Sequence, residues 1–402
     1  MRIFQLNTVC GIKSTGRIAA EIGKLVEAEG GVCRVGCGAN PVPPHAEHMA
    51  YRTLSVFQRK LYTLMIRYFD ADGFWNRTGT RRLIREMERF QPDVVHLHNI
   101  HGGYLHAETL FRYLKKKNLP VVWTLHDCWP FTGHCAYFDY SGCQRWLTGC
   151  HHCPHKTSYP VCVGLDRSRS HHIRKRKAFT GISNLTMVIP CQWLSQHLSR
   201  SCLQDYPVRV IYNGVDLTSF RPTPGDIRQR YGIPDGRLIL AVAAEWDERK
   251  GLRYLIEAAG KLGPDDHFVV IGLSPEQIAA LPENMLGIQH TASVDELAQW
   301  YTAADCFANP SMEDNMPMVN LEALACGTPI AAFRTGGTPE AIDEATGIVV
   351  DKGDVDGLCQ AIRQLTPKTP ERVEACLRRA QRFDAKQTFE EYLTLYREVQ
   401  KG

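Results

Sequence analysis

No stretch of the 402-residue chain approaches the roughly 20 consecutive apolar residues that a membrane-spanning helix needs. The N-terminus, Met1–Asn7, also lacks the charged start, the long apolar run and the small-residue cleavage site of a signal peptide, and it predicts a β-strand instead. Internal repeats with a period of about 20–50 residues and low-complexity segments are absent, which excludes a solenoid. We therefore expect a cytoplasmic globular protein.

A large excess of charge of one sign is missing as well. The chain has 47 Lys and Arg against 43 Asp and Glu, for a formal net charge of +4. This balance argues against a dedicated nucleic-acid binder, although it leaves room for a local basic patch. The length exceeds that of one ordinary hydrophobic core, so two domains are expected.

Short β-branched runs alternate with longer helical patterns along the chain, which predicts βαβ units and parallel sheets. We expect one α/β domain over residues 1–203, with a Cys-rich insertion at about 128–162, and a second α/β domain over 204–385. A strand predicted at Val208–Ile211 is expected to open the second domain. A final helix is predicted over 386–402.

Two acidic side chains, Asp314 and Glu322, lie seven residues apart in a segment that begins with turn-forming residues and continues into a predicted helix. Backbone N–H groups at the start of a helix bind anions. A carboxylate two turns further along is badly placed for phosphate and well placed for sugar hydroxyls. This pairing suits a nucleotide-sugar, and the segment expected against its phosphates comprises Asn315, Met316, Pro317 and Met318.

Three other groups in the second half accompany this segment. A cationic loop follows a predicted strand and opens a helix, where its side chains can meet a diphosphate. Alone, it would predict only a solvated charged loop, and the two glycine-containing turns that accompany it would predict only chain reversals. The residues concerned are Arg249 and Lys250 in the cationic loop, Asn213 and Gly214 in the first turn, and Gly336 and Gly337 in the second.

In this order and spacing, the groups resemble the acidic-x7-Glu signature of family 4 type retaining glycosyltransferases with the GT-B fold, of the bacterial polysaccharide-biosynthesis type. The resemblance implies two Rossmann-like domains facing across a cleft, with the last helix crossing back to the first domain. It also implies transfer of a hexosyl-type sugar from a nucleoside diphosphate sugar to a hydroxyl acceptor, with retention at the anomeric carbon. No metal cofactor is needed for this chemistry, because helix N-termini and cations stabilise the leaving diphosphate.

The resemblance assigns Lys250 to the phosphates, Glu322 to the ribose and Asp314 to the donor sugar hydroxyls. Asp314 stands where the family has Glu. Glu245 stands where the family has a phosphate-binding Arg, so whether Arg249 replaces that cation is open.

Two predicted strands of the first half end in histidine, at His98 and His126. Ligands bind beyond the carboxyl ends of strands in open α/β sheets, although a strand-end His can also be a structural residue. The resemblance matches His126 to the family's strand-end His, which faces the donor sugar. It matches Gly16 to a Gly-rich loop that touches the diphosphate or the acceptor.

Four cysteines, Cys135, Cys143, Cys150 and Cys153, fall within nineteen residues, and the last two form Cys-x2-Cys. A reducing compartment disfavours disulfides, and closely paired thiolates are typical zinc ligands, so we predict a structural zinc. The alternative is an irregular loop with free thiols. Other candidate ligands are His134, His151, His152 and His155.

Basic residues concentrate in Arg52–Phe90 and Arg167–Lys177. They form either solvated helix faces or a patch for anionic lipid headgroups. Because similar enzymes build exopolysaccharide, capsule or lipopolysaccharide, the resemblance implies a glycan or lipid-linked acceptor and peripheral attachment at the inner membrane face. Two other functions compete: a nucleotide-sugar epimerase of the same fold, and a zinc-stabilised nucleic-acid binder, which the balanced charge disfavours.

Overall fold

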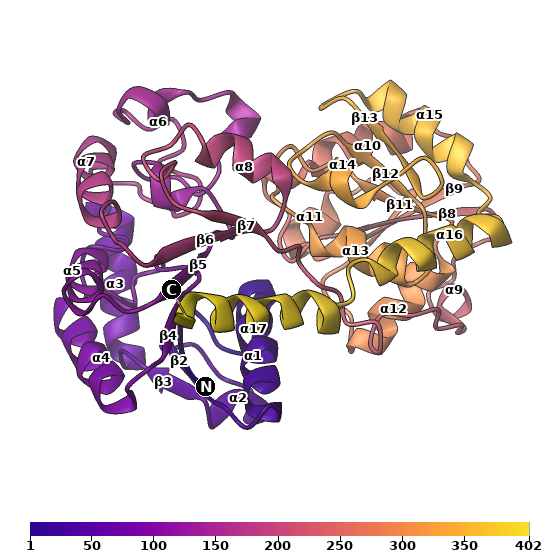
Figure 1. The fold of residues 1–402 in the computed structure, drawn as a ribbon. Helices are drawn as coiled ribbons and strands as arrows, with labels where there is room; N and C mark the ends of the chain where they lie inside the picture. The colour runs from indigo at the N-terminus through magenta and orange to yellow at the C-terminus, as the bar shows by residue number, and fades with distance from the viewer. Residues whose placement is uncertain (402) are drawn as a thin grey trace. The chain divides into compact units, whose positions relative to one another are not determined.

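The computed structural model describes residues 1–401, which form two compact units (Figure 1). The first unit contains Met1–Ile211 and the chain from Phe389 onward, and the second contains Tyr212–Thr388. We expected the changes of domain near residues 203 and 385, and they follow Ile211 and Thr388. Among the described residues, no helix is both long and apolar enough to cross a bilayer.

Seven parallel strands make the sheet of the first unit, in the order β3-β2-β1-β4-β5-β6-β7. The inner strands are short, apolar and buried along their whole length, as expected when helices cover both faces of a parallel sheet. The strands are β1 Arg2–Leu6, β2 Val32–Cys37, β3 Ala50–Arg52, β4 Val94–Leu97, β5 Val121–Thr124, β6 Leu185–Ile189 and β7 Val208–Val210.

Helices connect these strands. Their bounds are α1 Lys13–Ala28, α2 Pro44–Glu47, α3 Val56–Phe69, α4 Arg77–Phe90, α5 Ala107–Lys117, α6 Arg145–Thr148, α7 Ser168–Phe179 and α8 Gln192–Leu198, with 3-10 turns at Trp129–Phe131 and Asp139–Ser141. The last helix, α17 Ala385–Lys401, begins in the second unit and continues in the first. There the hydroxyl of Tyr396 donates to Nδ1 of His96 on β4 at 2.6 Å, which anchors the helix to the sheet.

A six-stranded parallel sheet forms the second unit, in the order β10-β9-β8-β11-β12-β13. Its strands are β8 Arg237–Val242, β9 Asp266–Ile271, β10 Met285–Ile288, β11 Cys306–Asn309, β12 Ile330–Phe333 and β13 Gly347–Val350. Its helices are α9 Ile227–Arg230, α10 Leu252–Lys261, α11 Pro275–Ala279, α12 Val294–Ala303, α13 Met318–Ala325, α14 Thr338–Ala341, α15 Val355–Leu365 and α16 Pro370–Gln381, with a 3-10 turn at Glu248–Lys250. Leu255 on α10 and Ile362 on α15 are fully buried in one apolar core with the sheet.

The expected fold class, two α/β domains with parallel sheets, is confirmed. One strand was assigned to the wrong sheet: Val208–Val210 pairs with β6 and closes the first sheet, although we expected it to open the second. The sequence pattern alone could not decide which sheet this strand joins, because a strand between two sheets has the same apolar pattern in either one.

Each sheet reverses its winding direction once, between β1 and β4 in the first and between β8 and β11 in the second. Loops leave the carboxyl edge in opposite directions at such a point and form a crevice there. In the second unit the two loops are those that follow β8 and β11.

Candidate functional site

The loops after β8 and β11 bring the predicted cationic and acidic residues of the second unit together. Nζ of Lys250 lies 2.5 Å from Oδ2 of Asp314. Arg249 donates from Nη1 to the backbone carbonyl of Glu313 at 2.7 Å, and the same nitrogen lies 3.9 Å from Oδ2 of Asp314. Burial opposes ionisation of this carboxyl, but Lys250 and Arg249 outweigh it and hold the pKa of Asp314 below its ordinary value. Asp314 is therefore a carboxylate at neutral pH.

Backbone contacts fix these loops against each other. The N–H of Met312 donates to the carbonyl of Arg249 at 2.8 Å, and the carboxylate of Asp247 accepts from the N–H of Lys250 at 3.0 Å. Gly251 follows with φ +78°, and a Cβ there would lie 2.3 Å from the carbonyl oxygen of Pro310. Only glycine fits so close to the second loop.

Gly336 and Gly337, predicted near the donor, lie against the acidic segment. Gly336 has φ +49°, and a Cβ there would meet the carbonyl oxygen of Asp314 at 1.6 Å. The N–H of Gly337 donates to the carbonyl of Asn315 at 2.5 Å. The double glycine thus lets a third loop close over the backbone of the acidic segment.

Helix α13 begins at Met318, directly after Pro317. Glu322 is half-buried one turn into this helix, where the Tyr301 hydroxyl donates to Oε2 at 2.9 Å. The amides at the helix start and this carboxylate are thus carried by one rigid element. An anion at the start of the helix would be stabilised by N–H groups and by the helix dipole.

The two residues of the predicted Asn213–Gly214 turn have different roles. Nδ2 of Asn213 donates to the carbonyl of Met316 at 3.0 Å, so this side chain braces the segment before α13. A Cβ at Gly214 would lie 2.4 Å from Cα of Ala385, which makes this glycine a packing requirement at the start of α17.

In the first unit, His98 and His126 belong to one hydrogen-bonded chain. Nε2 of Gln5 donates to the carbonyl of Ala19 at 2.7 Å, so Oε1 of Gln5 accepts from Nε2 of His98 at 2.8 Å. Nδ1 of His98 then accepts from Nε2 of His126 at 3.0 Å. Burial lowers the pKa of His126 to about 4 and holds that of His98 well below its ordinary value, so both rings are neutral at physiological pH. In this tautomer Nδ1 of His126 is an acceptor.

Gly16 lies in the first turn of α1, where a Cβ would come within 2.8 Å of Cγ2 of Val9. Its carbonyl accepts from the N–H of Gly11 at 2.9 Å, which closes the loop between β1 and α1. This loop leaves the carboxyl edge of β1 at the reversal point of the first sheet. Its predicted contact with the diphosphate or the acceptor stays a prediction.

The predicted zinc ligands share one irregular segment. The side chain of Cys135 hydrogen bonds to Cys153 and, as the largest influence, lowers the pKa of the Cys153 thiol to about 7. The N–H of Gly133 donates to Sγ of Cys150 at 3.1 Å, and Oδ1 of Asp70 lies 2.6 Å from Nδ1 of His134. Over residues 1–401, however, no three His, Cys, Asp or Glu side chains are grouped so that they could hold a metal ion. The zinc assignment to the four cysteines stays a prediction.

Sequence reasoning missed Tyr301, the partner of Glu322. It comes from α12, 21 residues earlier, and no local motif marks it. It also missed Asp247, whose side chain caps the turn that carries Lys250. An Asp directly before a helical turn is a capping signal and could have identified it.

Two family models match the chain. The model described as Glycosyltransferase Family 4 matches residues 43–219, and the model described as Glycosyl transferases group 1 matches residues 236–367. The second match contains both loops of the Lys250–Asp314 cluster.

WcaC of Escherichia coli K12, assigned by its name to colanic acid biosynthesis as a glycosyl transferase, is 26% identical over 354 residues, which cover 83% of each protein. Among solved structures, sucrose-phosphate synthase of Thermosynechococcus elongatus matches with a TM-score of 0.72 at 16% identity, covering 99% of this chain and 98% of that one. HepE of Anabaena in complex with UDP matches with a TM-score of 0.66 at 16% identity, covering 99% and 100%. These likenesses extend over both α/β units.

Proposed function

Because this chain belongs to the GT-B glycosyltransferases that join a Family 4 domain to a group 1 domain, we propose that it moves a hexosyl group from a nucleoside diphosphate sugar to a hydroxyl acceptor, with retention at the anomeric carbon. The observation that carries the proposal is the cluster of Lys250, Arg249 and Asp314 before α13, with Glu322 one turn into that helix. Cations, helix amides and carboxylates there match the phosphates and hydroxyls of such a donor.

Each side chain then has one role. Lys250 and the amides at the start of α13 stabilise the charge that develops on the leaving diphosphate. Glu322, oriented by the Tyr301 hydroxyl, accepts from the ribose hydroxyls. Asp314, ionised beside Lys250, accepts from hydroxyls of the donor sugar. Neutral His126 does not repel a developing positive charge on the sugar.

Retention is proposed through attack from the same face as the departing phosphate, without a covalent sugar–enzyme intermediate. The carboxylate next to His126 supports this, since Asp127 is buried and both of its oxygens are engaged. Oδ2 lies 2.8 Å from Nε2 of His101, and Oδ1 accepts from the N–H of Trp129 at 3.0 Å. A carboxylate held in this way is a poor nucleophile.

The likeness to WcaC supports a role in the biosynthesis of exopolysaccharide, capsule or lipopolysaccharide, with a glycan or lipid-linked acceptor. HepE, which binds UDP, supports a uridine nucleotide as the first donor to test.

We further propose peripheral attachment to an anionic inner-membrane surface through α3. None of its residues is buried, and it exposes 78% of Phe57 and 52% of Leu64 beside basic residues such as Lys60 and Arg67. Sedimentation with anionic vesicles and not with neutral ones is expected. Binding should weaken with salt, as the Debye length shrinks from about 10 Å at 0.1 M to about 3 Å at 1 M. Equal binding to both vesicle types, at any salt concentration, would rule this out.

A screen of nucleotide-sugars for protection against thermal unfolding tests the main proposal, because a ligand that binds only the folded state raises the Tm. The donor that protects is then incubated with the protein and followed by NMR, first alone and then with candidate acceptors. We expect the donor sugar to keep its configuration without an acceptor and to appear in a product of the same anomeric configuration with one. Interconversion of the donor sugar alone would show an epimerase instead.

A further inference from the structure

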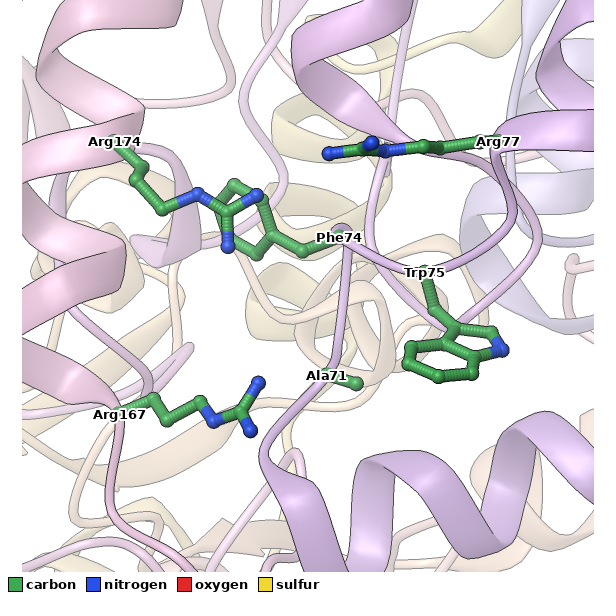
Figure 2. Close-up of a pocket in the computed structure, with 6 residues that line it drawn as sticks. All are labelled: Ala71, Phe74, Trp75, Arg77, Arg167 and Arg174. Carbon is green, nitrogen blue, oxygen red and sulfur yellow. The ribbon is translucent and has the colours of Figure 1, made fainter.

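A concave site lies entirely within the first unit. It is a pocket of about 390 Å³, lined by Ala71, Phe74, Trp75, Arg77, Arg167 and Arg174. This volume is within the range of about 300–1,000 Å³ that small-molecule sites occupy. Figure 2 shows the guanidinium groups of Arg174 on α7 and of Arg167, directly before α7, extending toward the segment that carries Ala71, Phe74 and Trp75. Arg77 points in from the start of α4 (Figure 2).

The three guanidinium groups give the pocket a net positive charge. Arg174 is bidentate to Glu108, with both N–O distances 2.7 Å, and its guanidinium lies 4.1 Å from the centre of the Phe74 ring. Within residues 1–401, neither Arg77 nor Arg167 makes a salt bridge to a carboxylate, although Nε of Arg77 donates to Nε2 of His106 at 3.1 Å. The positive charges of these two side chains are therefore not neutralised by a carboxylate and can attract an anion. Guanidinium groups match phosphate oxygens in geometry and charge.

The walls of the pocket are held in place before any ligand arrives. Asp70, buried at the end of α3, accepts from the N–H of Arg167 at 2.9 Å. Asp72 accepts through one oxygen from the N–H groups of Gly102 and Gly103, at 2.6 and 2.9 Å. Binding of an anion here would lose little free energy to the ordering of protein side chains, which favours affinity.

These contacts also place the pocket. Gly102 and Gly103 belong to the loop that follows β4, and the same loop holds His98 and His101 near its start. The pocket thus borders the carboxyl edge of the first sheet, where ligands bind in parallel α/β folds.

An apolar strip adjoins the cations. Trp75 lines the pocket with 43% of its surface exposed, and Tyr68 and Leu165 are exposed by 48% and 51%. The N–H of Leu165 donates to the carbonyl of Tyr68 at 2.9 Å, so the segment before α7 lies beside the end of α3. Exposed aromatic and aliphatic side chains that gather next to a cationic pocket suit a ligand with an anionic head and an apolar chain.

We propose that this pocket binds the phosphate or pyrophosphate of an amphiphilic acceptor, in which a sugar is joined through that group to a long apolar alcohol. The three arginines hold the anion, and Trp75 with the strip formed by Tyr68 and Leu165 receives the start of the apolar chain. The identification of the ligand as the acceptor rests on the proposed glycosyl transfer, whereas the binding of the anion does not.

The test is calorimetry on the full chain with farnesyl diphosphate and with inorganic pyrophosphate, in the presence of saturating UDP to occupy the donor site. Farnesyl diphosphate should bind more tightly than pyrophosphate. Arg167→Ala should weaken both ligands at least about tenfold, the loss expected for one hydrogen bond to a charged group. Trp75→Ala should weaken farnesyl diphosphate alone.

Arg176→Ala is the matched control, because Arg176 is exposed on the same helix and does not line the pocket. It should leave both affinities within about twofold of the parent, since surface substitutions away from a site have small effects. Unchanged circular dichroism and an unchanged affinity of Arg167→Ala for UDP would show that its fold and its donor site are intact.

Wild-type affinity in Arg167→Ala, or no binding of either ligand, overturns the proposal. Equal affinities for the two ligands, with no effect of Trp75→Ala, overturn the amphiphilic part and assign the pocket to a soluble phosphate. Failure of the donor proposal is separate: in that case UDP binding is absent or insensitive to Lys250→Ala, whatever farnesyl diphosphate does.

Discussion

Removal of the Lys250 ammonium is the perturbation whose outcome the structure constrains most closely. Its Nζ lies 2.5 Å from Oδ2 of Asp314, and the two side chains are only 17% and 18% exposed. In Lys250→Ala, Asp314 retains Arg249 at 3.9 Å and the N–H of Asn315 at 3.0 Å. The acidic loop therefore keeps two of its contacts, and the fold should survive.

Binding of a nucleoside diphosphate should weaken by roughly tenfold to a hundredfold, because a hydrogen bond to a charged group contributes about 1.5–3 kcal/mol. Binding of the nucleoside alone should change by less than about twofold, since the target of Lys250 is the phosphate. Calorimetry with UDP and with uridine, at a temperature well below the Tm, measures both. Arg253→Ala is the control, because this exposed arginine on α10 contacts Tyr254 and not the acidic loop.

Equal weakening of UDP and uridine would refute the phosphate assignment and leave Lys250 a purely structural role. The stability of the variant gives an independent check. The pKa of Asp314 is lowered in the folded protein, so its ionised form stabilises the fold above pH 3.8, the value in the unfolded chain, and this stabilisation is lost as the pH falls. Lys250→Ala should therefore lower the Tm at pH 7 more than at pH 3.

Three further predictions follow from other parts of the molecule. Glu322→Gln should weaken donor binding or turnover about tenfold to a hundredfold, and activity within about twofold of the parent would contradict its role at the ribose. The NMR signals of the carbon-bound ring protons of His126 should shift with a midpoint near pH 4, because burial keeps the ring neutral. The contribution of neutral His126 to folding stability is complete above about pH 6.5 and is lost as the pH falls toward 4. A midpoint near pH 6.5 would show an exposed ring. Elemental analysis of freshly reduced protein purified without added zinc should give about one zinc per chain, and a metal-free folded protein would dismiss the assignment to Cys135, Cys143, Cys150 and Cys153.

Much of this architecture could be predicted because the signals are local. The buried strands β4 and β5 are mostly apolar and β-branched, and the acidic segment combines turn residues with a helical pattern. The spacing of Asp314 and Glu322 predicted a segment for a nucleotide-sugar, and this segment follows β11 at the reversal point of the second sheet.

What could not be predicted depends on contacts between distant segments. Tyr301 orients Glu322 from another helix, and the tautomer of His126 depends on Gln5 and His98. The Arg167 pocket is built by the end of α3 and the start of α7, which no sequence pattern links. Gly214 shows the converse, since a turn signal predicted near the donor is required for packing against α17.

The central claim is that the loops around Lys250 and Asp314 hold the nucleotide of the donor. Photocrosslinking with a photoreactive UDP analogue, followed by peptide mapping, tests it most directly. We expect the label within residues 236–367, on peptides from the loops after β8, β11 or β12, and we expect unlabelled UDP to suppress it. A UDP-suppressible label confined to residues 1–211 would contradict the claim.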